Sequence, residues 1–507
     1  MVNRPKPERW TRLAAAIGAA ALFGLCATSA HAQGEILDEL LEKLKDKGVL
    51  SETEYQALKK AREDELMQQR DERRRQAVKQ AQDAEKEQKA QEAAAKATKF
   101  DVNPSIKTMQ VYGDVRLRFE ARDGYSPSPA GLGVTGTNDV SRERWRYAAR
   151  IGIRGDLTDD WFYGLRLDTG QNNRSAWVTF GGDTNLGTNG QGPSAKNDDG
   201  VGIGQVYMGW RTTPWLTLQA GKMPNPFYTT PMVWDPDIQP EGVAERLTYK
   251  VGDSLELFGN FAQMVYQDVN PDQTQGVDLG FHKKDAFQLG WQGGAIYKFS
   301  PEMNVKGAVT YYNYVGLGTS QPFTGHGPVP PAATTGYFNA QNGINNLRIL
   351  EIPFEFNFPL WGRSARVFGD FAKNMDGGER ARLAGSPGVD EDTAYQLGVA
   401  YGNLGLVYGT TAKKGTWEVR TYWQRIEQFA LDPNLTDSDF FEGRTNLQGL
   451  YVAGAYSFTD AIIGTLRYGY AQRINHSLGT GGSNPDLPYI NPIDDYRLIQ
   501  FDLTWKF

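Results

Sequence analysis

Apolar and polar residues alternate along most of the chain after residue 107. In the last segment, the odd-numbered positions from Ile499 to Phe507 are apolar, whereas the even-numbered positions from Gln500 to Lys506 are polar. Successive side chains of a β-strand point to opposite faces, so this pattern predicts a strand with one apolar and one polar face. Repetition of the pattern predicts sixteen strands, at residues 109–121, 143–157, 161–171, 203–213, 216–223, 243–251, 254–266, 285–300, 303–316, 348–359, 363–375, 393–405, 416–428, 446–459, 461–474 and 496–507.

The connectors between these strands alternate between short and long. The long ones lie at 122–142, 172–202, 224–242, 267–284, 317–347, 376–392, 429–445 and 475–495. Short turns at one end and long loops at the other are typical of a transmembrane β-barrel. We therefore predict an all-β fold, a transmembrane antiparallel β-barrel of about 16 strands (roughly 14 to 18), formed by residues 100–507.

Tryptophans near the predicted strand ends favour a membrane barrel over a soluble sandwich or propeller, because aromatic side chains concentrate at the two membrane interfaces. These residues are Trp145, Trp161, Trp210, Trp291, Trp417 and Trp505. The alternating strand that ends the chain on an aromatic residue resembles the terminal signal of bacterial outer-membrane proteins, which the barrel-assembly machinery recognises. The residues that carry this resemblance are Phe501, Leu503, Trp505 and Phe507.

Residues 1–32 have the layout of a secretory signal peptide. Basic residues precede an apolar stretch, and Ala30-His31-Ala32 follows as a cleavage site. Cys26 is the one cysteine of the chain, so cleavage after Ala32 predicts an exported protein without disulfide bonds. Export and the barrel pattern together predict the bacterial outer membrane as the location.

Residues 33–99 differ in composition from the barrel segment, being rich in Ala, Glu, Lys, Gln and Arg. Leucines between 37 and 44 recur at helical spacing, Gly48 ends that pattern, and Ser51 with Glu54 forms a capping box for a second helix. We predict a periplasmic helical or coiled-coil segment. A solvated helix with charge pairs along its surface explains the sequence equally well.

No constellation in the chain predicts catalysis or metal binding. The histidines after the signal peptide are His282, His326 and His476, and none is at metal-ligand spacing with another His or Cys. Ser477 follows His476 directly, so on a strand the two side chains would point to opposite faces. We therefore predict no enzyme activity, no catalytic residue, no cofactor and no metal.

The inward face of the first three strands is predicted to form a basic wall. Its residues are Arg116, Arg118, Arg144, Arg146, Arg150, Arg154 and Arg166, accompanied by Asp114, Glu120, Asp156 and Asp168. Sixteen strands enclose an aqueous channel, and basic rings in a channel favour anions. The alternative is that these charges pair across the strands. The formal net charge of the chain is −6, so anion or cation preference stays open.

The third long connector, 224–242, is predicted to fold inward and narrow the pore. Its five prolines limit its mobility, and backbone at that depth is tolerated where it is buried or lines water. Tyr228 would pack on the wall with two other aromatic residues. The predicted constriction residues are Pro226, Phe227, Trp234, Asp235, Asp237 and Glu241, with the three acids facing the opening. The alternative is a loop that folds outward.

The stretch "AGKMPNPFYTTPMVWDPDIQPEGVA" resembles a signature of the putative porin family of Gram-negative bacteria. The order of signal peptide, "LLEKLKDKGVLSETEYQALKK" helix and barrel ending in aromatic-Lys-Phe is also similar. The resemblance implies an outer-membrane porin, a water-filled channel for passive diffusion of small hydrophilic solutes or ions. The helical prelude is distantly similar to that of phosphate-selective porins, which implies a homotrimer.

The expected partners are outer-membrane lipid, the barrel-assembly machinery, further copies of the chain and small solutes or ions, with no nucleic acid. A second class of function is a structural or adhesive outer-membrane barrel, tethered to the cell wall through the N-terminal helix. A third class, an outer-membrane enzyme, is disfavoured by the scarcity of histidine.

Overall fold

The computed structural model describes residues 42–43, 45–48, 51–97, 103–126, 139–170, 175–181, 200–268, 285–316, 346–384, 386–480, 486–487, 490 and 492–507. The chain divides into two compact units, Met1–Val102 and Asn103–Phe507. The predicted signal peptide, residues 1–32, lies outside the described residues. The domain bounds at 33–99 and 100–507 stay predictions.

The first unit contains the long helix α2 (Glu52–Ala97). Its start has the predicted capping box, because the Ser51 amide donates to Glu54 Oε2 at 3.0 Å and the Glu54 amide donates to Ser51 Oγ at 3.4 Å. Leu58 and Met67 are exposed, as are most described side chains of this helix. Among the described residues, no helix has the length and apolar content that a membrane crossing requires.

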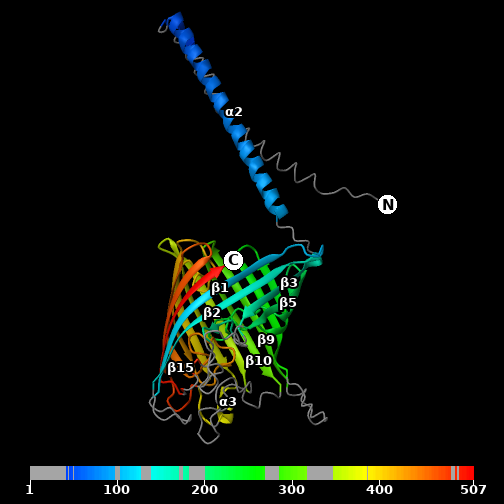
Figure 1. Ribbon diagram of the computed structural model, residues 1–507, viewed down its shortest axis with the longest axis vertical. Helices are drawn as coiled ribbons and strands as arrows, with labels where there is room; N and C mark the ends of the chain where they lie inside the picture. The colour runs from blue at the N-terminus through cyan, green and yellow to red at the C-terminus, as the bar shows by residue number, and fades with distance from the viewer. Residues whose placement is uncertain are drawn as a thin grey trace, which may run out of the picture. The chain divides into compact units, whose positions relative to one another are not determined.

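The second unit is built on one antiparallel sheet of seventeen strands (Figure 1). The strands are β1 (Gln110–Tyr125), β2 (Asp139–Asp156), β3 (Trp161–Thr169), β4 (Val178–Thr179), β5 (Val201–Thr213), β6 (Leu216–Lys222), β7 (Glu241–Val251), β8 (Leu255–Gln267), β9 (Ala286–Ser300), β10 (Met303–Val315), β11 (Arg348–Leu360), β12 (Arg363–Asn374), β13 (Thr393–Gly402), β14 (Trp417–Ile426), β15 (Leu447–Ser457), β16 (Ile462–Arg473) and β17 (Asp495–Lys506). The turn between β2 and β3 contains η1 (Thr158–Asp160), and the connector after β12 contains α3 (Gly377–Leu383).

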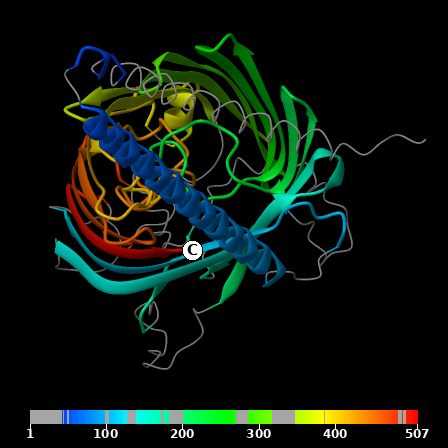
Figure 2. The same cartoon turned by 90° about the horizontal axis from the view of Figure 1, so that it is seen from above.

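The sheet closes into a barrel, which Figure 2 shows as a ring seen from above. Sixteen strands pair in chain order and β17 returns to β1, with Phe119 opposite Phe501. The two-residue β4 is an addition that pairs with β2 at Arg146 and Tyr147. The prediction of a sixteen-stranded antiparallel barrel is therefore confirmed, since each predicted strand overlaps one of these sixteen.

The outer face of the barrel is apolar and the inner face is polar. Leu117 of β1 and Trp145 and Ile151 of β2 are exposed. Arg118 and Glu120, on the opposite face of β1, are buried. A soluble barrel would place these two classes the other way round. Apolar residues exposed around a closed barrel, with polar residues inside, define a surface that is solvated by lipid.

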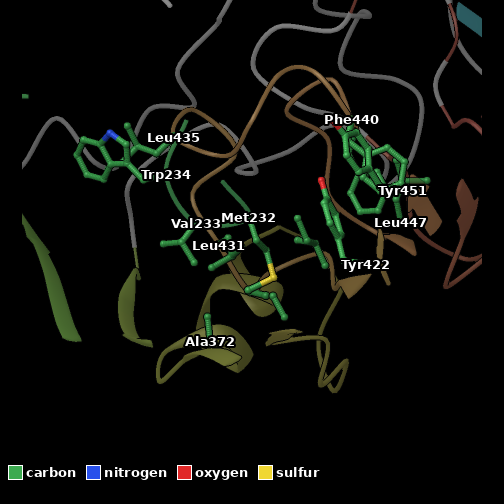
Figure 3. Packing of buried hydrophobic residues seen from close by; sticks show 14 of the residues in the cluster. Met232, Val233, Trp234, Ala372, Tyr422, Leu431, Leu435, Phe440, Leu447 and Tyr451 are labelled. Atoms are coloured by element: carbon green, nitrogen blue, oxygen red, sulfur yellow. The ribbon is translucent and has the colours of Figure 1, made fainter. Parts of the chain in front are cut away.

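The largest hydrophobic cluster lies inside the barrel and contains residues of both the strands and the connectors. It joins loop 3 (residues 223–240), loop 7 (427–446) and loop 8 (474–494) to inward residues of the strands. Figure 3 shows members from loops 3 and 7 together with Tyr422 and Tyr451 of the strands. Met232, Phe440 and Ile490 each have at most 1% of their surface exposed. In Figure 2 connectors coloured green and orange occupy part of the ring.

The connector between β13 and β14 is longer than predicted. We expected strands to 405 and from 416, but β13 ends at Gly402 and β14 begins at Trp417. Gly402, Gly405 and Gly409 have positive φ angles, which end the strand and allow the chain to turn sharply. Residues 403–416 therefore form a folded segment in place of a short turn.

Candidate functional site

Loop 3 is hydrogen-bonded to the inward face of β9. The Tyr228 amide donates to Gln292 Oε1 at 2.9 Å, and Gln292 Nε2 donates to the Tyr228 carbonyl at 2.8 Å. This side chain thus pairs with the loop backbone as a neighbouring strand would. Next along the loop, Thr229 donates to Glu351 of β11 and Thr230 donates to Asp370 of β12, both at 2.5 Å.

Space for the start of loop 3 is provided by small residues on the wall. Phe227 lies over Gly290 of β9, where a Cβ atom would come within 2.2 Å of the Phe227 ring. The same ring meets Tyr312 of β10 edge to face, with centroids 5.3 Å apart. Ala244 and Ala262, inward on β7 and β8, belong to the same hydrophobic cluster. Glycine at position 290 is therefore required by the close approach of the loop.

The far part of loop 3 packs against loop 7. The Asp235 amide donates to the Leu435 carbonyl at 2.6 Å, and the Asp437 amide donates to the Pro231 carbonyl at 3.0 Å. The Asp235 carboxylate accepts hydrogen bonds from the amide and hydroxyl of Ser438, at 3.2 and 3.1 Å. Figure 3 shows Met232 and Val233 beside residues of loop 7. Two loops that are far apart in the chain are thus joined, since 203 positions separate Ser438 from Asp235.

Two of the three acids expected to face an opening lie elsewhere. Asp235 is 3% exposed and serves as a hydrogen-bond acceptor within the loop contact. Glu241 is the first residue of β7 and forms an ion pair of 3.0 Å with Lys222, on the same face of the sheet as the exposed Val243. Asp237 fits the expectation better, because it is partly exposed and lies 3.2 Å from Arg150 of β2.

The remaining predicted loop residues are buried. Pro226 and Phe227 are buried at the start of loop 3. Trp234 is 4% exposed, and its Nε1 donates to the Ile238 carbonyl at 3.0 Å. Both aromatic rings therefore hold the loop against its surroundings, and neither faces water.

The arginines of the basic wall that lie nearer the long loops are paired with acids, some of which belong to those loops. Arg118 donates to Asp502 of β17 and to Asp439 of loop 7, both at 2.7 Å. Arg144 contacts Glu120 and donates to Asp486 of loop 8 at 2.5 Å. Arg146 lies 3.5 Å from Glu120 as well.

The arginines of the basic wall that lie nearer the short turns are paired with acids of the same strands. Arg116 lies 2.6 Å from Asp114, and Arg166 lies 2.7 Å from Asp168. Arg154 differs, since it donates to Gln110 at 3.0 Å and is exposed. Of the two explanations left open by the sequence, pairing with acids therefore describes these arginines, with Arg154 as the exception.

Loop 7 carries two acids with opposite behaviour. Burial by itself would raise the pKa of Asp439, but the charge of Arg118 outweighs burial and holds the pKa below its ordinary value. Burial, together with the nearby carboxylates of Asp439 and Asp235, raises the pKa of Asp437 well above its ordinary value. Because the Asp437 amide donates to the Pro231 carbonyl, we expect the contact between loops 3 and 7 to depend on the protonation of Asp437.

Three inward connectors were not predicted from the sequence, namely loop 7, loop 8 and the segment 403–416. Loop 7 fills space beside loop 3, and its buried Arg444 donates to the carbonyls of Thr480, Leu487 and Ile490. The adjacent pair Phe440-Phe441 in a stretch otherwise rich in Asp and Asn was a signal for burial.

The segment 403–416 enters the barrel from the end with the short turns. Leu406 and Val407 are at most 2% exposed, and the Val407 amide donates to Glu418 of β14 at 3.0 Å. Arg420, also on β14, donates to the Tyr408 hydroxyl at 3.3 Å. Connectors therefore enter the barrel from both ends.

Among the described residues, no group of three or more His, Cys, Asp or Glu side chains is placed to hold a metal ion. Many polar side chains of the interior form ion pairs and hydrogen bonds with the loops.

A closed barrel with an apolar outer face, a polar inner face and long inward loops defines a channel protein of the bacterial outer membrane, of the porin class. The sequence profile of the putative porin family matches residues 128–324 and 363–507, more than half of the chain. The chain therefore belongs to the putative porin family. A comparison with curated proteins finds no match.

Solved porin structures are similar to the chain at low sequence identity. OprB from Pseudomonas putida, in a high-pH structure, is 11% identical with a TM-score of 0.45, over 79% of this chain and 94% of OprB. A triple mutant of the Rhodopseudomonas blastica porin is 11% identical with a TM-score of 0.35, over 79% of this chain and all of that chain. With TM-scores below 0.5, neither adds to what the strand pairing of this chain shows.

Proposed function

We propose that this outer-membrane channel admits small hydrophilic solutes or ions by passive diffusion and that loop 3, held by loop 7, sets the width of the pore. The observation that carries the proposal is the double attachment of loop 3. Its first half is bonded to β9, β11 and β12, and its second half is bonded to loop 7. A loop held at both places has little freedom to leave the lumen.

The loop also reaches the opposite wall. Asp237 lies 3.2 Å from Arg150, and Gln239 accepts a hydrogen bond of 2.8 Å from Gln205 of β5. Contacts on β5, β9 and β12 mean that the loop crosses the interior. Solutes must then pass beside it, where Asp237 and the half-exposed Arg116 contribute charge.

A homotrimer is the second part of the proposal. Glu245 of β7 and Gln263 of β8 share a hydrogen bond of 3.4 Å on the outward face, next to the exposed Val243 and Val265. Charged side chains facing lipid destabilise a barrel, so contact with another subunit would shield them. β6 supports this, because its 7 residues fall short of the about 9–11 that a membrane-spanning strand needs.

Further parts concern biogenesis and the first unit. We propose that residues 1–32 direct export, that the C-terminal residues Phe501 to Phe507 engage the barrel-assembly machinery, and that helix α2 lies in the periplasm. The outward exposure of Phe501 and Trp505 supports access by that machinery.

The test is a planar bilayer containing the mature protein. The proposal predicts discrete conductance steps, and a bilayer without steps would refute the channel. Asp237→Asn should change the conductance or the reversal potential in a salt gradient, because Asp237 is partly exposed. Glu241→Asn, a change on the outward face, is the matched control and should leave both unchanged.

A further inference from the structure

A second group of cations faces the interior on the wall opposite the predicted basic wall. Arg246 of β7, Lys306 of β10 and Arg366 of β12 point into the barrel. Each lies two positions from a buried residue on the same face of its strand, namely Ala244, Ala308 and Phe368. Arg246 is exposed, whereas Lys306 and Arg366 are half-buried. Both arginines lie close enough to Lys306 for their charges to act on it, and we call these three residues the inner cation cluster.

The cluster lies next to the anchor of loop 3, on the side of the short turns. Thr310 and Asp370 take part in the hydrogen bonds around that anchor, and Lys306 and Arg366 lie four residues further toward the short-turn end of the same strands. Lys306 Nζ is 3.8 Å from the ring centroid of Tyr228 in loop 3. A solute that passes loop 3 on this side therefore meets the cluster next.

The charge of the cluster is only partly balanced. Arg366 lies 3.3 Å from Glu355 and donates to Asn357 at 2.7 Å. Lys306 contacts aromatic rings, with Phe258 5.5 Å away in addition to Tyr228. Arg246 makes no hydrogen bond or ion pair with any described residue.

Neighbouring charges do not remove the excess. Glu256 of β8 is a second carboxylate near Lys306, and Lys250 of β7, a further cation, lies opposite it in the strand register. Counting Lys250 with the three cations of the cluster against Glu355 and Glu256 leaves an excess of two positive charges. The basic wall on β1 to β3, by contrast, has acidic partners for all its arginines but Arg154.

The donor set fits a small oxyanion. Guanidinium groups bind carboxylate or phosphate oxygens in a fork, and an ammonium group adds a point charge. Partial exposure keeps such binding weak, as conduction requires, because a solute that binds tightly would not leave. We propose that Arg246, Lys306 and Arg366 form a binding site for small solutes that carry a carboxylate or a phosphate group. This inference rests on the proposed channel function.

The experiment uses the mature channel in a planar bilayer with potassium chloride and adds inorganic phosphate or succinate to the short-turn side. Either anion should reduce the chloride current. In Arg246→Gln/Lys306→Gln the half-blocking concentration should rise about tenfold, because hydrogen bonds to charged groups are lost. The reversal potential in a salt gradient should move toward cation preference.

Two matched variants separate charge from structure. Arg246→Lys/Lys306→Arg keeps the charge and should retain the block, whereas Glu355→Gln adds to the positive excess and should strengthen it. Unchanged block and reversal potential in the double Gln variant would overturn the inference while leaving the channel intact. A wild-type protein without conductance steps would instead refute the proposed function itself. The anion that blocks at the lower concentration identifies the preferred group.

Discussion

Gln292 is the residue whose loss should most selectively release loop 3. Its side chain is 2% exposed and bonds both the amide and the carbonyl of Tyr228. It also accepts a hydrogen bond from Asn260 and donates one to Thr310, at 2.8 and 2.7 Å. Gln292→Ala removes both bonds to the loop without touching the loop itself.

The size of the effect follows from these two hydrogen bonds. Each contributes about 0.5–1.5 kcal/mol net, so the attached state of residues 226–230 loses about 1–3 kcal/mol relative to the detached state. That loss raises the detached fraction by roughly 5- to 150-fold. Contacts of Asp235 with Ser438 stay in place, so the far half of the loop should keep its position.

Hydrogen exchange of peptides from loop 3 measures this change. In Gln292→Ala, amides around Tyr228 should exchange faster, while amides of loop 7 keep their protection. Gln288→Ala is the control, because Gln288 is equally buried on β9 and donates to the Tyr314 hydroxyl at 2.7 Å with no recorded bond to loop 3. Equal protection of Tyr228 in both variants would refute the anchoring role of Gln292.

Three further variants test the other connectors. Arg118→Met leaves Asp439 and Asp502 without their shared cation, which costs about 3–5 kcal/mol, so the barrel should unfold at a lower temperature in detergent, and adding Asp439→Asn should recover part of the loss. The raised pKa of Asp437 means that the folded state favours its protonated form. Its contribution to loop packing is therefore present at acid pH and lost as pH rises, so exchange in loop 7 should increase with pH in the wild type, after correction for intrinsic rates, and less in Asp437→Asn. Replacing 404–411 by Asn-Gly should raise the single-channel conductance by less than removal of loop 3 does, because Leu406 and Val407 lie inside the barrel. Unchanged conductance would show that this segment lies outside the ion path.

The strands could be predicted from the sequence because lipid outside and polar surroundings inside impose a strict period of two. The segment from Ile499 to Phe507 shows this, since its odd positions are exposed in the barrel and its even positions are buried or half-buried. The capping box at Ser51 was also predictable, because it depends on residues three positions apart.

The loop contacts could not be predicted in the same way. Asp235 accepts from Ser438, and Arg118 donates to Asp439, and both contacts join residues more than 200 positions apart. Alternation places Arg118 on the inner face but carries no information about which loop acid approaches it. The expectation that Asp235 faces an opening failed for this reason, while Asp237 two residues later is partly exposed.

The inner cation cluster was missed because its members are spread over β7, β10 and β12. Four arginines stand close together at residues 144–154 and attract notice, whereas Arg246, Lys306 and Arg366 are far apart in the sequence. The conspicuous arginines are mostly paired with acids, whereas the scattered cations share one ion pair, between Arg366 and Glu355.

The central claim is that loop 3 narrows an outer-membrane channel, and single-channel conductance tests it most directly. Wild-type protein is compared, in the same bilayer and salt, with a variant in which residues 226–238 are replaced by Gly-Ser-Gly. Intact folding of the variant is checked by its resistance to unfolding in detergent. The account predicts discrete steps for both proteins and larger steps for the variant, whereas steps of equal size would contradict it.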